Sequence, residues 1–170
     1  MKQLRYSVAM SLDGFIAGPK GEYDWIVMDP NFDWKGLYAQ FDTLLMGRAT
    51  YDIMRERRMS PKGMGMNAYV VSTTLKPEEH PDVTLIQENV AGSVKALKAG
   101  PGKDIWLMGG GILFRSLLDA GLVNAIDVGV VPVLLGNGVP LVPEGHRCTL
   151  KLAECNPRPN GVVSLKYEVA

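Results

Sequence analysis

Three consecutive glycines, Gly109 to Gly111, follow a short apolar run, Ile105 to Met108, which predicts a buried strand ending in a tight turn. Apolar residues then recur at the spacing of a helix face, at Ile112, Leu113, Leu117 and Leu118. Glycines let a ligand approach the backbone, and a helix start presents free N–H groups and a positive dipole end, which together suit a phosphate. The alternative is a glycine turn that only lets helix and strand pack closely. The G-x-G-x-x-G dinucleotide fingerprint is not present in the sequence.

A second predicted strand ends in the same way. The buried segment Thr43 to Met46 runs into Gly47, Arg48 and Thr50, where a helix is expected to begin. The planar guanidinium of Arg48 could bind a phosphate through two parallel hydrogen bonds, and Thr50 could add a hydroxyl or cap the helix. The alternative is an exposed arginine beside an ordinary helix cap.

The third predicted strand, Ala68 to Val71, ends in Ser72, Thr73 and Thr74, whose hydroxyls could form a turn or bind a phosphate. In an open parallel sheet, ligands bind outside the carboxyl ends of the strands. We therefore expect the three strand ends to share one edge, with a backbone cradle for a pyrophosphate and an arginine with hydroxyls for another phosphate. An additional phosphate bound by arginine distinguishes NADP from NAD.

Two loops are candidates for the substrate side of such a site. The loop from Ser11 to Gly18 contains a turn dipeptide and apolar residues, so it either closes the end of the core or covers a ligand. The irregular segment from Gly21 carries Trp25 among several acids and ends at Asp33, directly before a predicted helix. Asp33 suits the N-cap of that helix and is also a candidate for binding substrate or relaying a proton.

Strands and helices alternate along the chain, which predicts an α/β protein with a largely parallel central sheet and three αβα layers. Strands are expected at 3–10, 43–46, 68–71, 83–86, 105–108 and 125–131, and helices after Asp33, Gly47, Asn89 and Gly111. Alternating runs at 149–154 and 162–169 predict a final antiparallel hairpin in which Leu150 and Leu152 face the core.

Composition excludes several classes of protein. Hydrophobic residues make up 46% and charged residues 21% of the 170 residues, with 18 basic and 18 acidic side chains, so no charge excess favours nucleic acid or an anionic membrane. No apolar run is long enough for a membrane span or a signal peptide, so a cytoplasmic protein is expected. Cys148 and Cys155 are expected to be buried reduced thiols, and the histidines are too far apart to predict a metal site.

In order along the chain, the segments S-L-D-G-F-I-A, L-M-G-R-A-T-Y, V-V-S-T, W-L-M-G-G-G-x-L and P-V-L-L-G-N-G resemble the dihydrofolate reductase-like superfamily. Within it, the chain is most similar to the reductase domain of bifunctional riboflavin deaminase-reductases and to its stand-alone bacterial relatives. The resemblance covers about Leu4 to Val169. Since the resemblance covers nearly the whole chain and 170 residues are enough for one domain, we expect one domain over residues 1–170.

The resemblance implies an NADPH-dependent reductase that commonly forms a homodimer. It places Gly47, Arg48 and Thr50 at the adenosine side of NADPH, with Arg48 on the 2′-phosphate and with Ser72 and Thr73 beside it. It further places the pyrophosphate on the segment Gly109, Gly110, Gly111, Ile112 and Leu113, and it sets Ala9 and Ile16 beside the nicotinamide. The loop from Ser11 would be a mobile flap over the reacting ring.

The expected substrate is a small heterocycle of the pyrimidine or pterin type, as for 5-amino-6-(5-phosphoribosylamino)uracil reductases. Trp25 and Asp33 are the substrate-binding candidates, and Asp33 is the catalytic candidate, with Asp29 as its rival for that role. Two other functions stay open. One is a sensor that binds NADP(H) without turnover, and the other is true dihydrofolate reduction, which predicts inhibition by antifolates.

Overall fold

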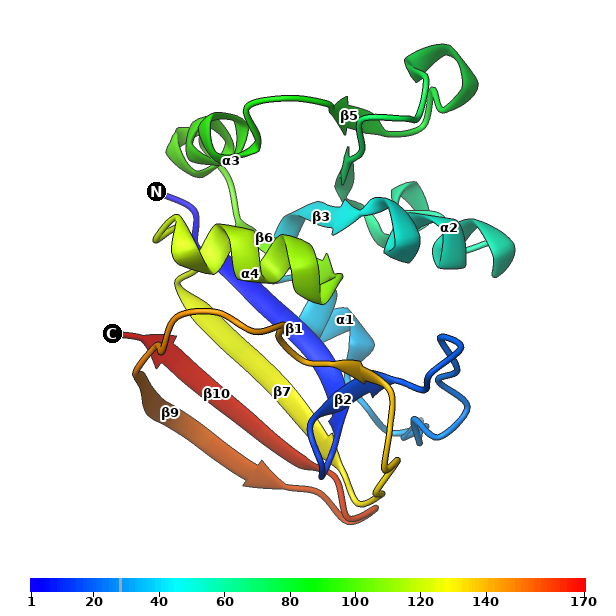
Figure 1. Ribbon diagram of the computed structural model, residues 1–170, viewed down its shortest axis with the longest axis vertical. Coiled ribbons are helices and arrows are strands. Elements are labelled where there is room, and N and C mark those ends of the chain that lie inside the picture. The colour runs from blue at the N-terminus through cyan, green and yellow to red at the C-terminus, as the bar shows by residue number, and fades with distance from the viewer. Residues whose placement is uncertain (28) are drawn as a thin grey trace.

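A computed structural model describes residues 1–27 and 29–170, and in this part of the chain eight strands form one mixed sheet (Figure 1). Across the sheet the order is β5 (Thr84–Ile86), β4 (Asn67–Val71), β3 (Phe41–Gly47), β6 (Asp104–Gly109), β1 (Leu4–Ser11), β7 (Ala125–Val131), β10 (Val163–Val169) and β9 (Leu150–Pro157). A smaller second sheet, which the sequence analysis did not predict, pairs β2 (Phe15–Ala17) with β8 (Val139–Pro140).

Strands β5, β4, β3, β6, β1 and β7 run parallel to one another, and β10 pairs antiparallel with both β7 and β9. The helices are α1 (Trp34–Tyr38), α2 (Arg48–Glu56), α3 (Val90–Ala99) and α4 (Gly111–Asp119), with 3₁₀ turns η1 (Lys62–Met64) and η2 (Pro77–Glu79). This arrangement confirms the predicted α/β class, with its mostly parallel sheet and its final antiparallel hairpin.

Two hydrophobic clusters hold helices against the two faces of the sheet. On one face, α3 and α4 pack through residues such as Val94 and Phe114, and the rings of Phe114 and Tyr6 stack with centroids 3.9 Å apart. On the other face, α1 and α2 pack through Leu37 and Met54. The sheet is therefore the middle of three layers, and the odd-numbered residues of β1 point toward the α1 side.

The predicted elements agree with the structure where a strand or helix is buried. Strand β7 has the predicted bounds, and Asn89 caps α3 by accepting a hydrogen bond from the backbone N–H of Gly92. Helix α1, predicted after Asp33, ends at Tyr38, because Phe41 already begins strand β3. The side chain of Phe41 is buried in a hydrophobic cluster, and Leu37 of α1 packs against the same cluster.

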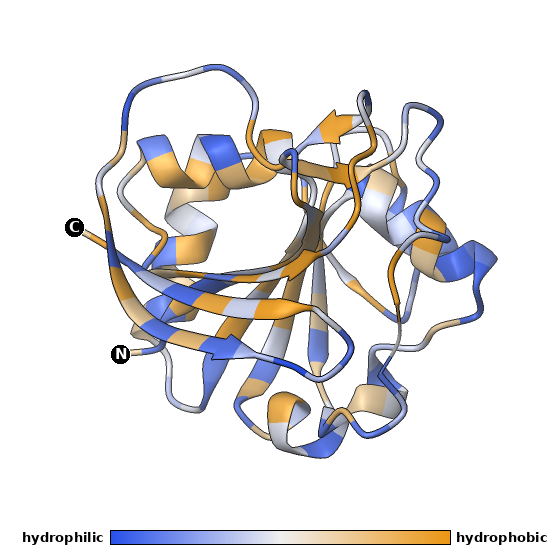
Figure 2. Ribbon diagram, turned by 90° about the horizontal axis from the view of Figure 1, so that it is seen from below, coloured by the Kyte–Doolittle hydropathy of each residue, from blue (hydrophilic) through white to orange (hydrophobic). Residues whose placement is uncertain are grey.

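The prediction that Leu150 and Leu152 face the core is wrong, because their exposed fractions are 37% and 52%. Strand β9 is the last strand of the sheet, and no helix of the described chain covers it in Figure 1. Polar and apolar residues alternate along the hairpin in Figure 2, and Leu152 pairs with Tyr167 on the face of the core, yet all residues of β9 are exposed at this edge position. Cys148 and Cys155 lie in this uncovered region and are exposed, so the prediction of buried thiols is also wrong.

Candidate functional site

Three neighbouring strands, β3, β4 and β6, end at one edge of the sheet (Figure 1). Gly47 at the end of β3 is in register with Val71 at the end of β4, and Met46 is in register with Gly109 at the end of β6. The segments that follow these strands carry the predicted glycines, the arginine and the hydroxyls. The structure thus brings them together at a single edge, which we call the strand-end rim.

Helices α2 and α4 both begin at this rim with a glycine N-cap. The caps are Gly47 and Gly110, and within residues 29–170 neither helix has a side chain bonded to its first turn. Their first N–H groups and positive dipole ends are therefore left for another partner. The two starts are adjacent, since a Cβ placed on Gly47 would lie 3.6 Å from the backbone nitrogen of Gly110.

Arg48 bridges two of the strand ends. Its Nη1 donates a 2.5 Å hydrogen bond to Oγ1 of Thr74, which follows β4. Its Nε lies 3.4 Å from a carboxylate oxygen of Asp52, one turn along α2, and half of the Arg48 side chain is exposed. The guanidinium is thus held at the rim, where an anion could reach it from solvent.

The hydroxyls after β4 differ in their roles. Ser72 is buried, and its Oγ accepts from the backbone nitrogens of Thr74 and Leu75 at 3.3 and 3.2 Å, so it shapes the turn. Thr73 is exposed. Thr74, the last of the three hydroxyl residues predicted at this strand end, is the one that contacts Arg48, whereas the family resemblance assigned cofactor roles only to Ser72 and Thr73.

Gly109 and Gly111 are required for different physical reasons. Gly109 has φ +150°, and a Cβ there would lie 3.0 Å from Oγ1 of Thr50. A Cβ at Gly111 would meet the carbonyl oxygens of Pro140 and Leu141 at 3.2 and 3.3 Å. Close packing therefore accounts for Gly111, whereas Gly109 brings the end of β6 against Thr50 at the rim.

The two residues that follow the glycines point in different directions. Leu113 is buried in the core, as its place in the helical pattern predicts. Ile112 was predicted to lie on the same apolar face, but 82% of it is exposed. The apolar face of α4 begins at Leu113, so Ile112 contributes to the rim through its backbone N–H rather than to the core.

The predicted flap, Ser11 to Gly18, is joined to the chain between Pro132 and Leu141. The carboxylate of Asp13 accepts from the backbone nitrogens of Leu135 and Gly136 at 3.1 and 2.7 Å, and β2 pairs with β8. A 2.6 Å hydrogen bond from Ser11, together with these N–H groups, lowers the pKa of Asp13. Any motion of the flap must therefore carry the 132–141 segment with it or break these bonds.

Ala9 and Ile16, predicted to lie beside the nicotinamide, are both half-buried. Ala9 is in register with Gly129 of β7, so two small residues lie side by side on the α1 face of the sheet. Ile16 belongs to β2 within the flap. A Cβ placed on Gly129 would lie 3.7 Å from Cγ1 of Val162, so the side chain of Val162 borders this small pair.

Trp25 and Asp33 lie on the irregular segment before α1. The indole nitrogen of Trp25 donates to the carbonyl oxygen of Glu22 at 3.1 Å, and the side chain is half-buried. Asp33 is exposed and caps α1, because its Oδ1 accepts from the backbone nitrogen of Gly36 at 2.8 Å. The capping role that the sequence predicted is confirmed, while a role of Asp33 toward substrate stays a prediction.

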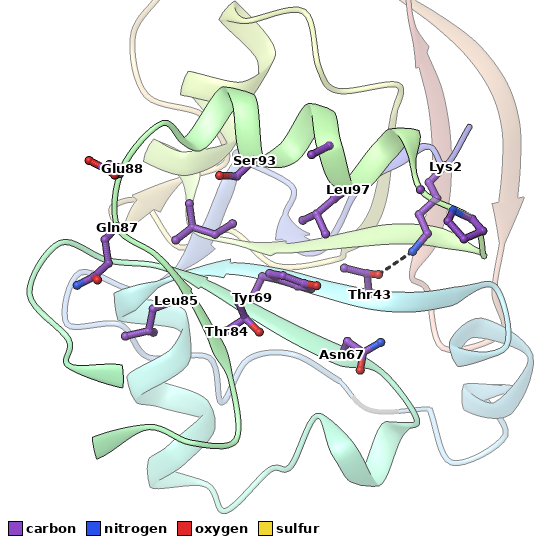
Figure 3. Close-up of a pocket in the computed structure, with 14 residues that line it drawn as sticks. Lys2, Thr43, Asn67, Tyr69, Thr84, Leu85, Gln87, Glu88, Ser93 and Leu97 are labelled. Carbon is purple, nitrogen blue, oxygen red and sulfur yellow. Dashed lines mark hydrogen bonds between the residues drawn. The ribbon is translucent and has the colours of Figure 1, made fainter. Parts of the chain in front are cut away.

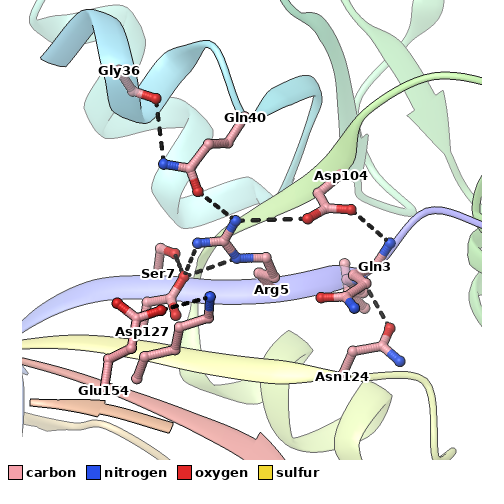
Figure 4. A network of polar contacts seen from close by, with 11 residues as sticks. Gln3, Arg5, Ser7, Gly36, Gln40, Asp104, Asn124, Asp127 and Glu154 are labelled. Carbon is pink, nitrogen blue, oxygen red and sulfur yellow. Dashed lines mark hydrogen bonds and ion pairs between the residues drawn. The ribbon is translucent and has the colours of Figure 1, made fainter.

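A charged network on the α1 face of the sheet was missed by the sequence analysis (Figure 4). Arg5 of β1 is buried and donates to Oδ2 of Asp127 from Nε at 3.0 Å and from Nη2 at 2.6 Å. Its Nη1 donates to Gln40 at 2.8 Å and lies 3.6 Å from Asp104. The available signal was a charged residue inside each of two apolar strands, since buried charges are rare unless paired.

The wall beside this network is aromatic. The ring of Phe32 packs against Trp34, and the guanidinium carbon of Arg158 lies 4.7 Å above the Phe32 centroid. Arg158 also donates to the hydroxyl of Ser164 at 2.9 Å. The turn between β9 and β10 thus reaches across to the segment that carries Asp33, and the two close one side of the sheet face.

A groove of about 970 Å³ lies elsewhere, between α3 and strands β3 to β5 (Figure 3). Its lining includes Tyr69, Ser93 and Leu97, and at one end Lys2 donates to the hydroxyl of Thr43 at 2.9 Å. None of the strand-end residues described above lines it. We therefore place the candidate site at the rim, where the helix starts and the arginine converge, and not in this groove.

Within the described ranges, 1–27 and 29–170, no helix is long and apolar enough to cross a membrane. The same residues contain no cluster of three or more histidine, cysteine, aspartate or glutamate side chains arranged to hold a metal ion.

Comparison with known proteins connects this geometry to a family. Residues 2–164 match the family described as the RibD C-terminal domain. The chain is also similar to the uncharacterised protein YyaP of Bacillus subtilis (strain 168), with 34% identity over 181 residues that cover 98% of this chain and 96% of YyaP.

Solved structures share the fold. A structure from Shewanella sp. PV-4, described as a riboflavin biosynthesis protein, superposes with a TM-score of 0.84 at 24% identity, covering 100% of this chain and 99% of the other. Dihydrofolate reductase from Enterococcus faecalis, complexed with NADP(H) and RAB-propyl, superposes with a TM-score of 0.70 at 20% identity, covering 98% of this chain and 94% of the other. The resemblance to dihydrofolate reductase-like proteins stated from the sequence is confirmed.

Proposed function

The protein belongs to the RibD C-terminal domain family, and we propose that it is an NADPH-dependent reductase that acts on a small nitrogen heterocycle. The observation that carries this proposal is the convergence of two uncapped helix starts and Arg48 at one edge of the sheet. A structure of the same fold, the Enterococcus faecalis dihydrofolate reductase, is complexed with NADP(H).

The residues of the rim fit the phosphates of NADPH. The N–H groups of Gly111, Ile112 and Leu113 belong to the uncapped first turn of α4 and would hold the pyrophosphate. Arg48 and the hydroxyl of Thr74 would hold the 2′-phosphate, because a guanidinium and a hydroxyl both donate to phosphate oxygens. Thr50 and Gly47 lie between these two groups and complete the surface.

Bound NADPH would supply a hydride to the substrate. The protein would position the two rings and keep water away from them. Ala9 and Gly129 would form a flat floor for the nicotinamide, and Ile16 in β2 would border it. The flap, tied to the 132–141 segment through Asp13, would restrict the access of water to the reacting ring.

The substrate would lie on the α1 side of the nicotinamide. Trp25 and the aromatic residues before α1 would form its wall, and Asp33 would orient it or relay a proton. The carboxylate of Asp33 caps α1 through Oδ1, and the residue is exposed. Asp33 would thus combine a structural role with a role in catalysis.

The direct test of the function is NADPH oxidation, followed at the nicotinamide absorbance band with a panel of pterins and pyrimidines. Oxidation that depends on one class of heterocycle would support the proposal. Tight binding of NADPH without oxidation across the panel would indicate a sensor instead, and turnover of dihydrofolate with inhibition by antifolates would indicate a true dihydrofolate reductase.

A further inference from the structure

The segment between β4 and β5 carries Thr74, the hydroxyl residue that contacts Arg48 at the strand-end rim. Most of this segment lies at the surface. Within residues 73–85, all of which the structure describes, His80 alone is buried, with an exposed fraction of 7%. A segment with few buried contacts opens locally at low cost, so its position depends strongly on what holds His80.

A buried hydrogen bond joins His80 to helix α2. Nδ1 of its ring lies 3.2 Å from the hydroxyl oxygen of Tyr51, and the two rings meet edge to face with centroids 5.5 Å apart. Leu75 and Val83 of the segment are half-buried and pack against the hydrophobic cluster that contains Tyr51. Apolar packing of this kind has no preferred direction, whereas the hydrogen bond restricts both a distance and an angle.

Helix α2 contacts the segment at two places. Arg48 and Tyr51 are three residues apart and share a face of the helix, from which Arg48 bonds to Thr74 and Tyr51 bonds to His80. The first contact is exposed, so water competes for both of its partners. The second is buried, and breaking it leaves a buried polar atom without a partner. The buried bond is therefore the contact that holds the segment against the helix.

We infer that His80 is a positioning residue for the 2′-phosphate of NADPH and that it acts through Tyr51. Their hydrogen bond keeps the hydroxyl of Thr74 beside the guanidinium of Arg48, so both donors are in place before the phosphate arrives. This inference rests on the proposed function, which puts the 2′-phosphate at Arg48 and Thr74. Because NADH lacks that phosphate, the pair sets the preference for NADPH over NADH and not the binding of the part that the two cofactors share.

Tyr51→Phe tests the inference, because it removes the hydroxyl and keeps the ring. We expect this variant to bind NADPH about three- to tenfold more weakly in fluorescence titrations, with NADH binding unchanged. Tyr69→Phe is the matched control, since it removes a tyrosine hydroxyl from β4 on the opposite face of the sheet, toward α3, and it should leave both affinities unchanged. Equal weakening of both cofactors by Tyr51→Phe, or no change in either, would overturn the inference.

Two substitutions of His80 separate its hydrogen bond from its bulk. In His80→Asn the amide lies near the position of Nδ1, so the preference for NADPH should be kept. His80→Leu fills the space without a hydrogen bond and should lose the preference as Tyr51→Phe does. In an Arg48→Ala background, Tyr51→Phe should cause no further loss of NADPH affinity, because the two residues act at the same phosphate. Equal preference in the two His80 variants, or equal losses in both backgrounds, would contradict the positioning role.

The two proposals fail separately. Failure of the unmodified protein to bind NADPH contradicts the proposed function. Amide hydrogen exchange without cofactor tests the hold on the segment by itself: the backbone N–H groups of Thr74 and Leu75, which bond to Oγ of Ser72, should exchange faster in Tyr51→Phe. Unchanged exchange together with an unchanged preference for NADPH leaves the cofactor site in place and contradicts only the role of His80.

Discussion

Arg48 Nη1 and Thr74 Oγ1 lie 2.5 Å apart, so the residue that opens α2 is joined to the loop that follows β4. This contact fixes a guanidinium at the edge where α4 also begins. Phosphate groups of one dinucleotide could therefore be bound by two helix starts and one arginine at the same time.

Arg48→Ala should weaken NADPH binding by about ten- to one-hundredfold and leave NADH binding unchanged, because one charge-assisted contact to the 2′-phosphate is removed. Fluorescence titration with both cofactors measures the effect. Arg55→Ala is the matched control, since Arg55 lies on the same helix and its guanidinium packs over the Tyr51 ring. Equal affinity of the unmodified protein for NADPH and NADH would contradict the assignment.

Gly109→Ala should weaken NADPH binding, because the new Cβ would lie 3.0 Å from Oγ1 of Thr50 at the rim. Gly121→Ala is a fair comparison, since Gly121 also has positive φ, +65°, and a Cβ there would meet nothing within 4 Å. Both variants should lose about 1–2 kcal/mol of unfolding free energy in a denaturant titration. Only Gly109→Ala should change cofactor affinity, and an equal change in both would argue against the rim.

Asp33→Asn should lower turnover with little effect on NADPH affinity, because the amide keeps the helix cap and removes the charge. Asp33→Ser also keeps a capping oxygen and should behave in the same way. Asp33→Ala should in addition lose about 0.5–2 kcal/mol of stability, since the backbone nitrogen of Gly36 loses its partner. Normal turnover of the Asn variant would show that Asp33 serves only as the N-cap of α1.

The contact between the flap and the 132–141 segment should weaken in acid. The pKa of Asp13 is lowered in the folded protein, so its contribution to stability is present above the ordinary value of 3.8 and is lost as pH falls from there through the folded pKa. The difference in unfolding free energy between the unmodified protein and Asp13→Asn should be constant above that pH and shrink below it. Amide exchange at Leu135 and Gly136 should accelerate over the same range. A difference that stays constant into acid would show that the charge of Asp13 does not hold the flap.

We propose that the protein is a homodimer that pairs through β9, because this strand is an uncovered sheet edge with exposed Leu152. In an antiparallel pairing about a two-fold axis between Leu152 and Ala153, Lys151 faces Glu154 of the partner subunit. Leu152→Glu should convert the dimer to a monomer in light scattering. Leu134→Glu, at an exposed leucine of the 132–141 segment, should not. A monomeric unmodified protein would disprove the proposal.

The sequence predicted the parts of the fold in which local pattern and burial agree. The apolar run of β7 identified its bounds, and the glycines at Gly47 and Gly109 marked the strand ends that meet at the rim. Each of these signals lies within a few residues of the chain. The shared edge followed because parallel strands end together, which is a property of the sheet and not of any one residue.

What the sequence did not predict depends on contacts between distant segments. Asp127 looks like an isolated acid in an apolar strand until β1 places Arg5 and Ser7 next to it, more than a hundred residues away. Leu150 and Cys155 follow patterns typical of burial, but the edge position of β9 leaves both of them exposed. The position of a strand within the sheet, which local pattern does not encode, decided each of these cases.

The most direct test of the central claim is a crystal structure of the protein with NADPH. We predict the pyrophosphate on the backbone N–H groups of Gly111 to Leu113, and the 2′-phosphate within hydrogen-bonding distance of both Arg48 and Thr74. NADPH bound in the groove beneath α3, or with its 2′-phosphate away from Arg48, would contradict the account.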